Sequence, residues 1–200
     1  FMSISATTNA GFDIVGASLL PYAHDYYVQT VNIFLMIFGS IGFPVLIELK
    51  RFLSRRKDKD AFRFSLYTKL TTITFFGLII VGTIGILALE QRHFLAGMNW
   101  HESFFYALFQ SVTTRNAGLA TMDVSQLTDA TLLLMCVLMF IGASPSSVGG
   151  GIRTTTFAIM FLFMLQYARG NKRVKVFNRE IHDDDIKKSL VVTLIALMVC

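Results

Sequence analysis

Long apolar runs separated by short polar segments dominate this chain. Residues 28–47 carry no charged side chain, and their length of about 20 residues suffices for a helix to cross ~30 Å of hydrocarbon. Residues 65–90 form a second run, whose internal charge Lys69 lies near its basic end, where it can reach the headgroups. A third apolar stretch covers 130–168, and a fourth begins at 189. The pattern predicts an all-α protein that crosses a membrane several times.

A shorter apolar segment, residues 103–112, is only about half as long as a membrane span, which is typical of a re-entrant helix. Lys and Arg residues crowd into 50–63 and 169–188, so the positive-inside rule predicts that both segments are cytoplasmic. The number of crossings is then consistent only if residues 103–122 enter and leave from the external side. We therefore expect a multi-pass protein of the cell membrane whose re-entrant loops open to the outside.

Two loops of the chain have nearly the same sequence, SATTNAGFD near the start and SVTTRNAGLAT past the middle. We call residues 7–11 the first NAG loop and residues 113–118 the second NAG loop; they end at Gly11 and Gly118. Each loop follows an apolar half-helix or its end and precedes a full apolar run. The sequence MIFGS in one of these runs matches MFIGA in the other. The repeating unit is therefore a span, a re-entrant helix, an NAG loop and a second span.

Each unit returns the chain to its starting side, because it contains two crossings and one dip. Successive units are thus parallel and can surround a common axis along the membrane normal. Similar sequences, RFSL and KKSL, open two of the units, so residues 1–62 end one unit, 63–180 form a complete one and 181–200 start another. We expect an internal piece of a longer protein, because Phe1 lies within a motif and Cys200 within an apolar run.

The repeated NAG loops are predicted to be segments of an ion selectivity filter. Irregular backbone at membrane depth is tolerated only where it is buried in protein or lines water. A loop that ends a re-entrant helix exposes carbonyl oxygens without helical partners, and several such loops around one axis can replace the water around a cation. Glycine permits the bent backbone and the close approach of neighbouring loops. The residues predicted to form the ion-binding filter are Thr8, Asn9, Ala10, Gly11, Thr114, Arg115, Asn116, Ala117 and Gly118.

Three charged residues lie in or just after the two loops, and we expect different roles for the arginine and the two aspartates. A guanidinium aimed into the filter would repel cations, so we expect Arg115 to point behind its loop, toward a carboxylate or carbonyl groups. Asp13 and Asp123 follow the loops and could attract cations at the outer mouth, or could be solvated or cap the next helix. A purely structural turn is the alternative interpretation of each loop, because a single NAG is a common turn sequence.

The third apolar stretch is interrupted by small and polar residues, GASPSSVGGGIRTTT (142–156). One proline and four glycines should break a helix there. The matching run 28–47 contains isolated glycines and a proline but no such polar insertion. We expect residues 142–156 to gate the filter from its cytoplasmic side; a kinked helix that makes close contacts is the alternative. The predicted gate residues are Gly142, Ser144, Pro145, Ser146, Ser147, Gly149, Gly150 and Gly151.

Composition and charge argue against several other classes of protein. The chain of 200 residues is 54% apolar and only 16% charged, which is more apolar than a typical soluble domain. Its net charge of +5 comes from basic clusters that flank apolar runs, which argues against nucleic-acid binding. The sequence has no HExxH motif, phosphate-binding loop or nucleophile–histidine set, so neither an enzyme nor a transition-metal or other cofactor is expected. The acidic residues after His182 are interpreted as a solvated turn rather than a metal site.

The segments SATTNAGFD, SVTTRNAGLAT and especially FIGASPSSVGGGIRTTT are similar to those of the K⁺ transporter superfamily that includes Ktr, Trk and HKT. Within it, the chain most resembles KtrB-type membrane subunits over essentially its whole length. The resemblance implies four M1–P–M2 repeats around a single pore, with one filter glycine per repeat. By position, Gly11 resembles the filter glycine of the second repeat and Gly118 that of the third. Residues 142–156 resemble the intramembrane gating loop, and the fourth repeat would begin near Ile186.

The resemblance also implies K⁺ uptake across the cytoplasmic membrane, with K⁺ as the transported ion and Na⁺ coupling left open. It implies two protein partners, a second copy in a homodimer and a cytoplasmic nucleotide-binding ring of the KtrA or TrkA type, beside membrane lipid. Two alternatives stay open: a secondary transporter of another small solute, and a Na⁺-selective member of the same superfamily. The first alternative predicts inverted repeats, whereas the repeats in this sequence read as parallel.

Overall fold

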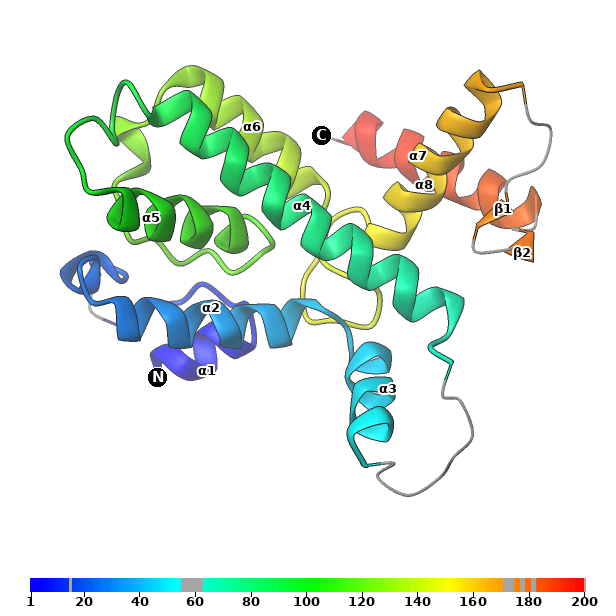
Figure 1. Cartoon of the computed structure of the whole chain (residues 1–200), viewed down its shortest axis with the longest axis horizontal. Helices are drawn as coiled ribbons and strands as arrows, with labels where there is room; N and C mark the ends of the chain where they lie inside the picture. Colours follow the sequence, from blue (N-terminus) through cyan, green and yellow to red (C-terminus); the bar gives the residue numbers. More distant parts are fainter. Residues whose placement is uncertain (15, 55–62, 171–174, 177–178, 181–182, 200) are drawn as a thin grey trace.

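The computed structural model describes all residues except 15, 55–62, 171–174, 177–178, 181–182 and 200, and within them the fold is helical (Figure 1). One antiparallel strand pair, β1 (Lys175–Val176) with β2 (Arg179–Glu180), is also present in this part. Apart from that pair, the predicted all-α class is confirmed. The helices are α1 (Met2–Thr7), α2 (Tyr26–Ser40), α3 (Phe43–Ser54), α4 (Leu66–Glu90), α5 (Trp100–Thr113), α6 (Asp129–Phe140), α7 (Thr154–Ala168), α8 (Asp183–Val199) and the 3-10 turns η1 (Leu20–Tyr22) and η2 (Val124–Gln126).

The central helix is α4, which packs against α5, α6 and α7 (Figure 1). It begins after Ser65, whose Oγ accepts a hydrogen bond from the Thr68 amide at 3.1 Å, and it confirms the predicted helix over 65–90. Its Gly82 lies against α5, where an added Cβ would be 2.4 Å from the Ser111 Oγ. Within the described residues, α4 is the one unbroken helix long and apolar enough to cross a membrane.

The predicted half-length helix is α5, which has 14 residues and lies against α4 and α2. At 1.5 Å per residue it is about 21 Å long, which is too short to span a bilayer. Its Phe109 and Val112 form a core cluster with Phe75 and Ile79 of α4 and Met36 of α2. Burial of these side chains fixes the short helix inside the protein, and the second NAG loop follows at its end.

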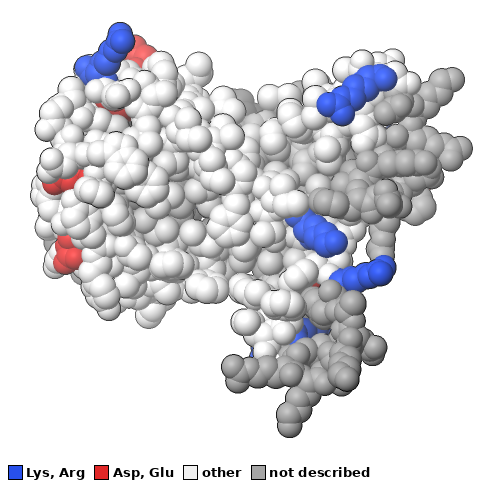
Figure 2. All heavy atoms as spheres, in the orientation of Figure 1, with Lys and Arg blue, Asp and Glu red and all other residues white. Residues whose placement is uncertain are grey.

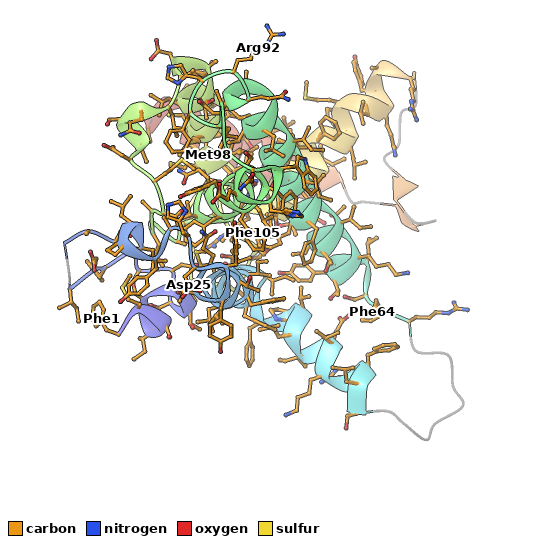
Figure 3. All side chains as sticks on the ribbon, turned by 60° about the vertical axis from the view of Figure 1, so that its left-hand side comes forward. Phe1, Asp25, Phe64, Arg92, Met98 and Phe105 are labelled. Carbon is orange, nitrogen blue, oxygen red and sulfur yellow. The ribbon has the colours of Figure 1, made fainter. Side chains whose placement is uncertain are left out.

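The N-terminal end of α2 is fixed beside α5. Asp25 caps α2 by accepting hydrogen bonds from the amides of Tyr27 at 3.0 Å and Val28 at 3.2 Å. The ring of Tyr26 packs on Phe105 of α5, with 4.9 Å between the ring centroids. Figure 3 shows Asp25 and Phe105 at this junction. The helix that follows the first NAG loop thus lies against the helix that precedes the second.

The apolar run 28–47 is not one helix, as its pattern predicted, but two. α2 ends at Ser40 and α3 begins at Phe43, and their axes are bent by 105°. Gly42 at the bend has a φ of +93°, a left-handed conformation that glycine adopts without strain. The Phe43 amide donates to the Ser146 carbonyl at 3.0 Å instead of to a residue of α2. Counted together, the bent pair is the second candidate for a membrane crossing in the described part of the chain.

The predicted interruption of the stretch 130–168 is confirmed. α6 ends at Phe140 and α7 begins at Thr154, so residues 141–153, here called the break, contain no helix. In Figure 1 the break lies at the centre of the molecule, near the bend between α2 and α3. The apolar run expected from 189 is part of α8, which begins at Asp183 and packs on α7.

Charged side chains are unevenly distributed over the molecule. In the view of Figure 2, most of the visible Lys and Arg side chains lie on the side of α3 and α7, whereas most of the visible Asp and Glu side chains lie on the opposite side. Arg92, in the segment after α4, is on the side away from α3 (Figure 3). The basic segments 50–63 and 169–188 are only partly within the described residues. The described part has the charge asymmetry that the positive-inside rule uses.

Candidate functional site

The two NAG loops, far apart in the sequence, lie side by side with their backbones in contact. A Cβ added to Gly11 would be 2.9 Å from the Ala117 carbonyl oxygen and 3.2 Å from the Gly118 Cα. The contact continues after the glycines, where the Leu19 amide donates to the Ala120 carbonyl at 3.0 Å. The structure therefore brings the predicted filter residues of both loops together and leaves no room for a side chain where the glycines meet.

Both loops have the same alternating backbone. Asn9 and Gly11 have φ angles of +48° and +68°, and Asn116 and Gly118 have +84° and +71°, whereas the alanine between each pair has no positive φ. Glycine, and to a smaller extent asparagine, adopts this left-handed region readily. A backbone that alternates in hand can turn successive peptide groups toward one side. The repeat in sequence is thus a repeat in backbone geometry.

The carbonyl oxygens at the ends of both loops lack hydrogen-bond donors among the described residues. This holds for the backbone carbonyls of residues 9–11 and 116–118, whereas an amide of the same region is paired: Ala10 donates to the Ser5 carbonyl at 3.0 Å. Carbonyl oxygens without a protein donor are available to water or to a cation. The two loops can therefore supply several oxygen ligands to a monovalent cation.

Polar side chains of the loops bind protein atoms instead. The hydroxyls of Thr8 and Thr114 donate to carbonyls in the last turns of α1 and α5, at 2.8 and 2.7 Å. Asn9 Nδ2 donates to the Ser40 Oγ at the end of α2, at 3.0 Å. These bonds fix the loops from behind, and the backbone carbonyls stay without a protein partner.

Arg115 points behind its loop, and its partner is a carbonyl rather than a carboxylate. The side chain is fully buried, and its Nη1 donates to the Ile141 carbonyl at 2.6 Å. Ile141 directly follows α6, so the positive charge lies at the carbonyl end of a helix, where it is favourable. The Nε and Nη2 atoms of Arg115 have no hydrogen-bond partner within the described residues.

The predicted gate is an ordered loop with partners on three elements. The Ser144 amide donates to the last carbonyl of α2 at 3.1 Å. The Tyr67 hydroxyl of α4 donates to the Pro145 carbonyl at 3.1 Å. From the second NAG loop, Asn116 Nδ2 donates to the Gly150 carbonyl at 3.2 Å. The break thus contacts the second NAG loop, the α2–α3 bend and α4.

The break is also closed by bonds within itself. Arg153 Nη1 donates to the Gly149 carbonyl at 2.5 Å, and the Ser147 hydroxyl donates to the Ser144 carbonyl at 2.6 Å. Sequence analysis assigned no role to Arg153 or to Tyr67. The available signal for Arg153 was a charged residue inside a long uncharged run; for Tyr67 there was none, because its partner lies far along the chain.

Asp13 and Asp123 accept hydrogen bonds from the backbone close to them. The Ser18 amide donates to Asp13 Oδ2 at 2.5 Å, and the Ser125 amide and hydroxyl donate to Asp123 Oδ1 at 3.0 and 2.8 Å. The bonds from Ser125 favour the ionised form, so the pKa of Asp123 lies below its ordinary value. The geometry at Asp123, which caps η2, fits the capping alternative, and attraction of cations at the mouth stays a prediction for both residues.

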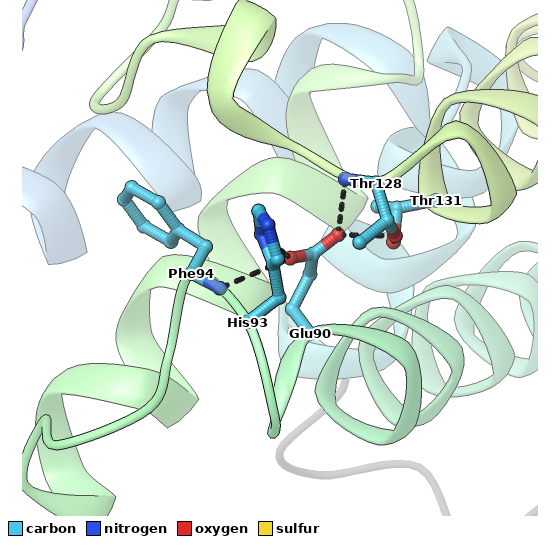
Figure 4. A network of polar contacts seen from close by, with 5 residues as sticks. All are labelled: Glu90, His93, Phe94, Thr128 and Thr131. Atoms are coloured by element: carbon cyan, nitrogen blue, oxygen red, sulfur yellow. Dashed lines mark hydrogen bonds and ion pairs between the residues drawn. The ribbon is translucent and has the colours of Figure 1, made fainter.

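Glu90, at the end of α4, is a buried carboxylate that sequence analysis did not single out. It accepts hydrogen bonds from the Thr128 amide at 2.9 Å, the Thr128 hydroxyl at 2.7 Å and the Phe94 amide at 3.3 Å (Figure 4). His93 Nδ1 lies 3.7 Å from the same carboxylate. Thr128 precedes α6, so Glu90 links the C-terminal end of α4 to the segment that comes after the second NAG loop.

Side-chain metal ligands do not gather in the part of the chain that is described: no three His, Cys, Asp or Glu residues there could hold a metal ion together. His182, considered with the acidic turn, lies outside the described residues. The candidate site is therefore the pair of NAG loops with the break beside them, and its ligand atoms are backbone oxygens.

Comparison with known proteins identifies the family. The family model TrkH, described as a cation transport protein, matches residues 1–200. The chain is 59% identical over 198 residues to the Ktr system potassium uptake protein D of Bacillus subtilis (strain 168), covering 99% of this chain and 44% of that protein. It is 34% identical over 199 residues to the Ktr system potassium uptake protein B of Vibrio alginolyticus, covering 98% and 43%. The chain spans less than half the length of these relatives.

The fold is similar to a solved structure as well. The crystal structure of the potassium transporter TrkH from Vibrio parahaemolyticus matches with a TM-score of 0.74 at 17% identity, covering 94% of this chain and 40% of that one. This likeness confirms the predicted all-α membrane fold with M1–P–M2 repeats. The relatives are transport proteins, in agreement with the prediction that the chain is not an enzyme. The chain therefore belongs to the TrkH family of membrane cation transport proteins, within the Ktr, Trk and HKT superfamily that its motifs resemble.

Proposed function

We propose that this chain forms part of a K⁺-translocating pore, with residues 8–11 and 114–118 as two of its filter segments. One observation carries the proposal: two loops of the same backbone geometry meet at Gly11 and Gly118, and the carbonyl oxygens of residues 9–11 and 116–118 have no donor among the described residues. The relatives are named potassium uptake proteins, which favours K⁺ as the transported ion.

Backbone oxygens suit the transfer of K⁺. A cation that leaves water needs several oxygen ligands, and neutral carbonyl dipoles bind it well enough to admit it and weakly enough to release it. In this chain the side chains of Thr8, Asn9 and Thr114 bind protein oxygens, so the carbonyl dipoles remain as ligands. The guanidinium of Arg115 is bound at the end of α6, which keeps its charge out of the ion path.

The break, with residues 142–156 as the predicted gate, is proposed to control the passage from the cytoplasmic side. Its hydrogen bonds to the α2–α3 bend and to Tyr67 support a closed arrangement that can be exchanged for an open one. Deletion of residues 144–154 from the complete protein is expected to raise K⁺ flux and to weaken its regulation, measured as K⁺ uptake by cells. Lower flux, or flux that stays fully regulated, would contradict this role.

The chain is proposed to cross the membrane in parallel units. Residues 1–62 would end the second repeat, 63–180 form the third and 181–200 begin the fourth. The half-length of α5 and the charge asymmetry of Figure 2 support this division, with the NAG loops open to the outside and segments 50–63 and 169–188 facing the cytoplasm. In this arrangement α5 enters and leaves the membrane from the external side.

Features of the complete protein are proposed from the family resemblance. Both relatives are named as parts of a Ktr system, which favours a protein that works with further subunits. The proposed partners, which the resemblance implies, are a second copy in a homodimer and a nucleotide-binding ring of the KtrA or TrkA type. Membrane lipid surrounds the apolar helices. No cofactor is proposed on this chain, and Na⁺ is the candidate coupling ion.

Rescue of a bacterium that lacks K⁺ uptake tests the function. The complete protein is expected to restore growth on low K⁺. Gly118→Ser should restore it only at higher K⁺, because a Cβ at this position would lie 3.2 Å from the Gly11 Cα and would distort both loops. Uptake of K⁺ and Na⁺, measured separately, distinguishes a K⁺ transporter from the Na⁺-selective alternative. No rescue by a folded, inserted protein, or Na⁺ uptake alone, would overturn the proposal.

A further inference from the structure

The second NAG loop contains one residue more than the first. The first loop reads TTNAG and the second TTRNAG, so Arg115 is an insertion. Its buried guanidinium donates to the carbonyl of Ile141, the first residue of the break. A charge-assisted bond of 2.6 Å, shielded from water, is among the stronger hydrogen bonds a protein can form. The insertion thus fixes one end of the break to the loop.

The next residue, Asn116, fixes the other end. Its Nδ2 donates to the Gly150 carbonyl at 3.2 Å. Gly149 lies directly against the same side chain, because a Cβ added there would be 2.8 Å from Asn116 Nδ2. The two ends of the break are also joined to each other, since the Ala143 amide donates to the Gly150 carbonyl at 3.2 Å. Two consecutive loop residues therefore contact both ends of the break.

In the first NAG loop, the corresponding asparagine contacts a helix instead. Asn9 donates to the Ser40 Oγ, which belongs to α2 itself and not to a non-helical segment. The chain resumes as a helix at Phe43. No arginine stands at the corresponding place in the first loop. Among the described residues, the second loop is bonded to both ends of the break, and the first loop has no such bonds to a segment that interrupts its following helix.

We propose that Arg115 and Asn116 are positioning residues that make the ion-binding geometry of the second NAG loop depend on the arrangement of the break. This inference rests on the proposed function, in which the loop binds K⁺ through its backbone. When the break moves, the bonds to Ile141 and Gly150 change, and the backbone of residues 116–118 changes with them. The filter and the gate are then one coupled element rather than two independent barriers.

A double-mutant cycle in the full-length protein tests the coupling. The variants are Asn116→Ala, deletion of residues 144–154, which removes Gly150, and both together; the measurement is the ratio of K⁺ to Na⁺ uptake. Loss of one hydrogen bond predicts a ratio about fivefold lower for Asn116→Ala. The combined variant should have the same ratio as the deletion alone, because the partner of Asn116 is already absent.

Asn9→Ala is the matched control. Its partner Ser40 remains in the deletion variant, so its effect should multiply with that of the deletion. If Asn116→Ala also multiplies with the deletion, the coupling is overturned. Arg115→Lys, which keeps the charge but not the planar donor fork, should lower the ratio in the intact protein.

The same cycle, measured as the unfolding temperature of the purified protein, requires no transport. Asn116→Ala should lower the unfolding temperature of the intact protein and leave that of the deletion variant unchanged. If the protein shows this pattern but does not carry K⁺, the proposed function is refuted, whereas the energetic coupling between the second NAG loop and the break is supported. Equal shifts in both backgrounds would refute the coupling whether or not the protein transports K⁺.

Discussion

The two repeated units share a loop and differ in the segment that comes after it. After the first NAG loop the chain forms α2, bends through 105° at Ile41 and Gly42, and continues as α3. After the second it forms α6 and then the 13-residue break between Phe140 and Thr154. The loops have the same signs of φ at the same positions. The comparison separates a geometry that both units need from a segment that only one of them has.

Two glycines at matching positions show how the two units pack differently. Gly39 and Gly142 occupy the same place in MIFGS and MFIGA, and each gives space to a carbonyl oxygen. A Cβ on Gly39 would lie 2.1 Å from the Thr7 carbonyl, and one on Gly142 would lie 1.9 Å from the Gly150 carbonyl. In the first unit the space is therefore filled by the loop's own helix, and in the second by the break. The break takes the place next to its helix that the first unit gives to α1.

The largest expected effect comes from placing a methyl group where the loops meet. Gly11→Ala puts a Cβ 2.9 Å from the Ala117 carbonyl oxygen at a φ of +68°, so both loops must shift. Strain of about 1–3 kcal/mol corresponds to roughly 5- to 150-fold weaker apparent K⁺ affinity. Gly118→Ala should be milder, because its Cβ would approach a Cα and not a ligand oxygen. K⁺ uptake kinetics measure both affinities. Equal K⁺ affinities in the unsubstituted protein, Gly11→Ala and Gly118→Ala would mean that the contact between the loops does not determine K⁺ binding.

A second test concerns the contact between the bend and the break. Gly42→Ala should destabilise the protein by about 2–3 kcal/mol, because its φ is +93° and the new Cβ would lie 2.6 Å from the Pro145 carbonyl oxygen. Gly150→Ala is the matched control, since a Cβ there meets nothing within 4 Å. Thermal unfolding of both variants is the measurement. Similar losses for the two would show that the bend does not support the break.

A third test concerns Glu90, at the C-terminal end of α4 in the second unit. Glu90→Gln removes the charge that accepts the bonds from Thr128 and Phe94 and places an amide group beside a backbone donor. We expect a loss of about 1.5 kcal/mol in unfolding free energy. Thr128→Val keeps the hydrogen bond from the backbone amide but not the one from the hydroxyl, so it should lose less unfolding free energy. An unchanged unfolding free energy in Glu90→Gln would mean that this carboxylate does not fix the segment after the second NAG loop.

The smallest effect is expected at Asp123. Its lowered pKa means that the ionised carboxylate stabilises the fold above the ordinary pKa of aspartate, and that this contribution is lost as pH falls through the lowered value. Asp123→Asn should therefore slightly lower the unfolding temperature at pH 7 and have no effect at strongly acidic pH. K⁺ uptake should hardly change if the residue only caps η2. A clear rise in the K⁺ concentration needed for uptake would instead support attraction of cations at the mouth.

Sequence alone predicted those features that depend on local composition. The length of α4, the shortness of α5 and the break at Pro145 follow from apolar run length and from helix-breaking residues. The bend at Gly42 was missed, because the apolar pattern continues through it and the amide of Phe43 bonds to a carbonyl about a hundred residues away. Long-range pairing of this kind leaves no local signal.

The candidate site was predicted in its members but not in its contacts. Repetition of NAG identified both loops, and the repulsion between a guanidinium and a cation predicted the direction of Arg115. Its partner Ile141 and the meeting of Gly11 with Gly118 depend on how α2, α4 and α5 pack, which hydropathy does not specify. Glu90 was overlooked because an acidic residue at the end of an apolar run usually marks only the membrane boundary.

The meeting of the two loops within one polypeptide has a consequence for how such a channel can change. In a ring of identical subunits, every substitution appears at all positions at once, so an added residue must be tolerated everywhere. Here the neighbouring segments are encoded separately, and an insertion such as Arg115 alters one quarter of a four-repeat ring while Thr8 and Asn9 keep the shorter form. On the proposed function, tandem encoding lets one ion-binding segment acquire a control function that its neighbour lacks.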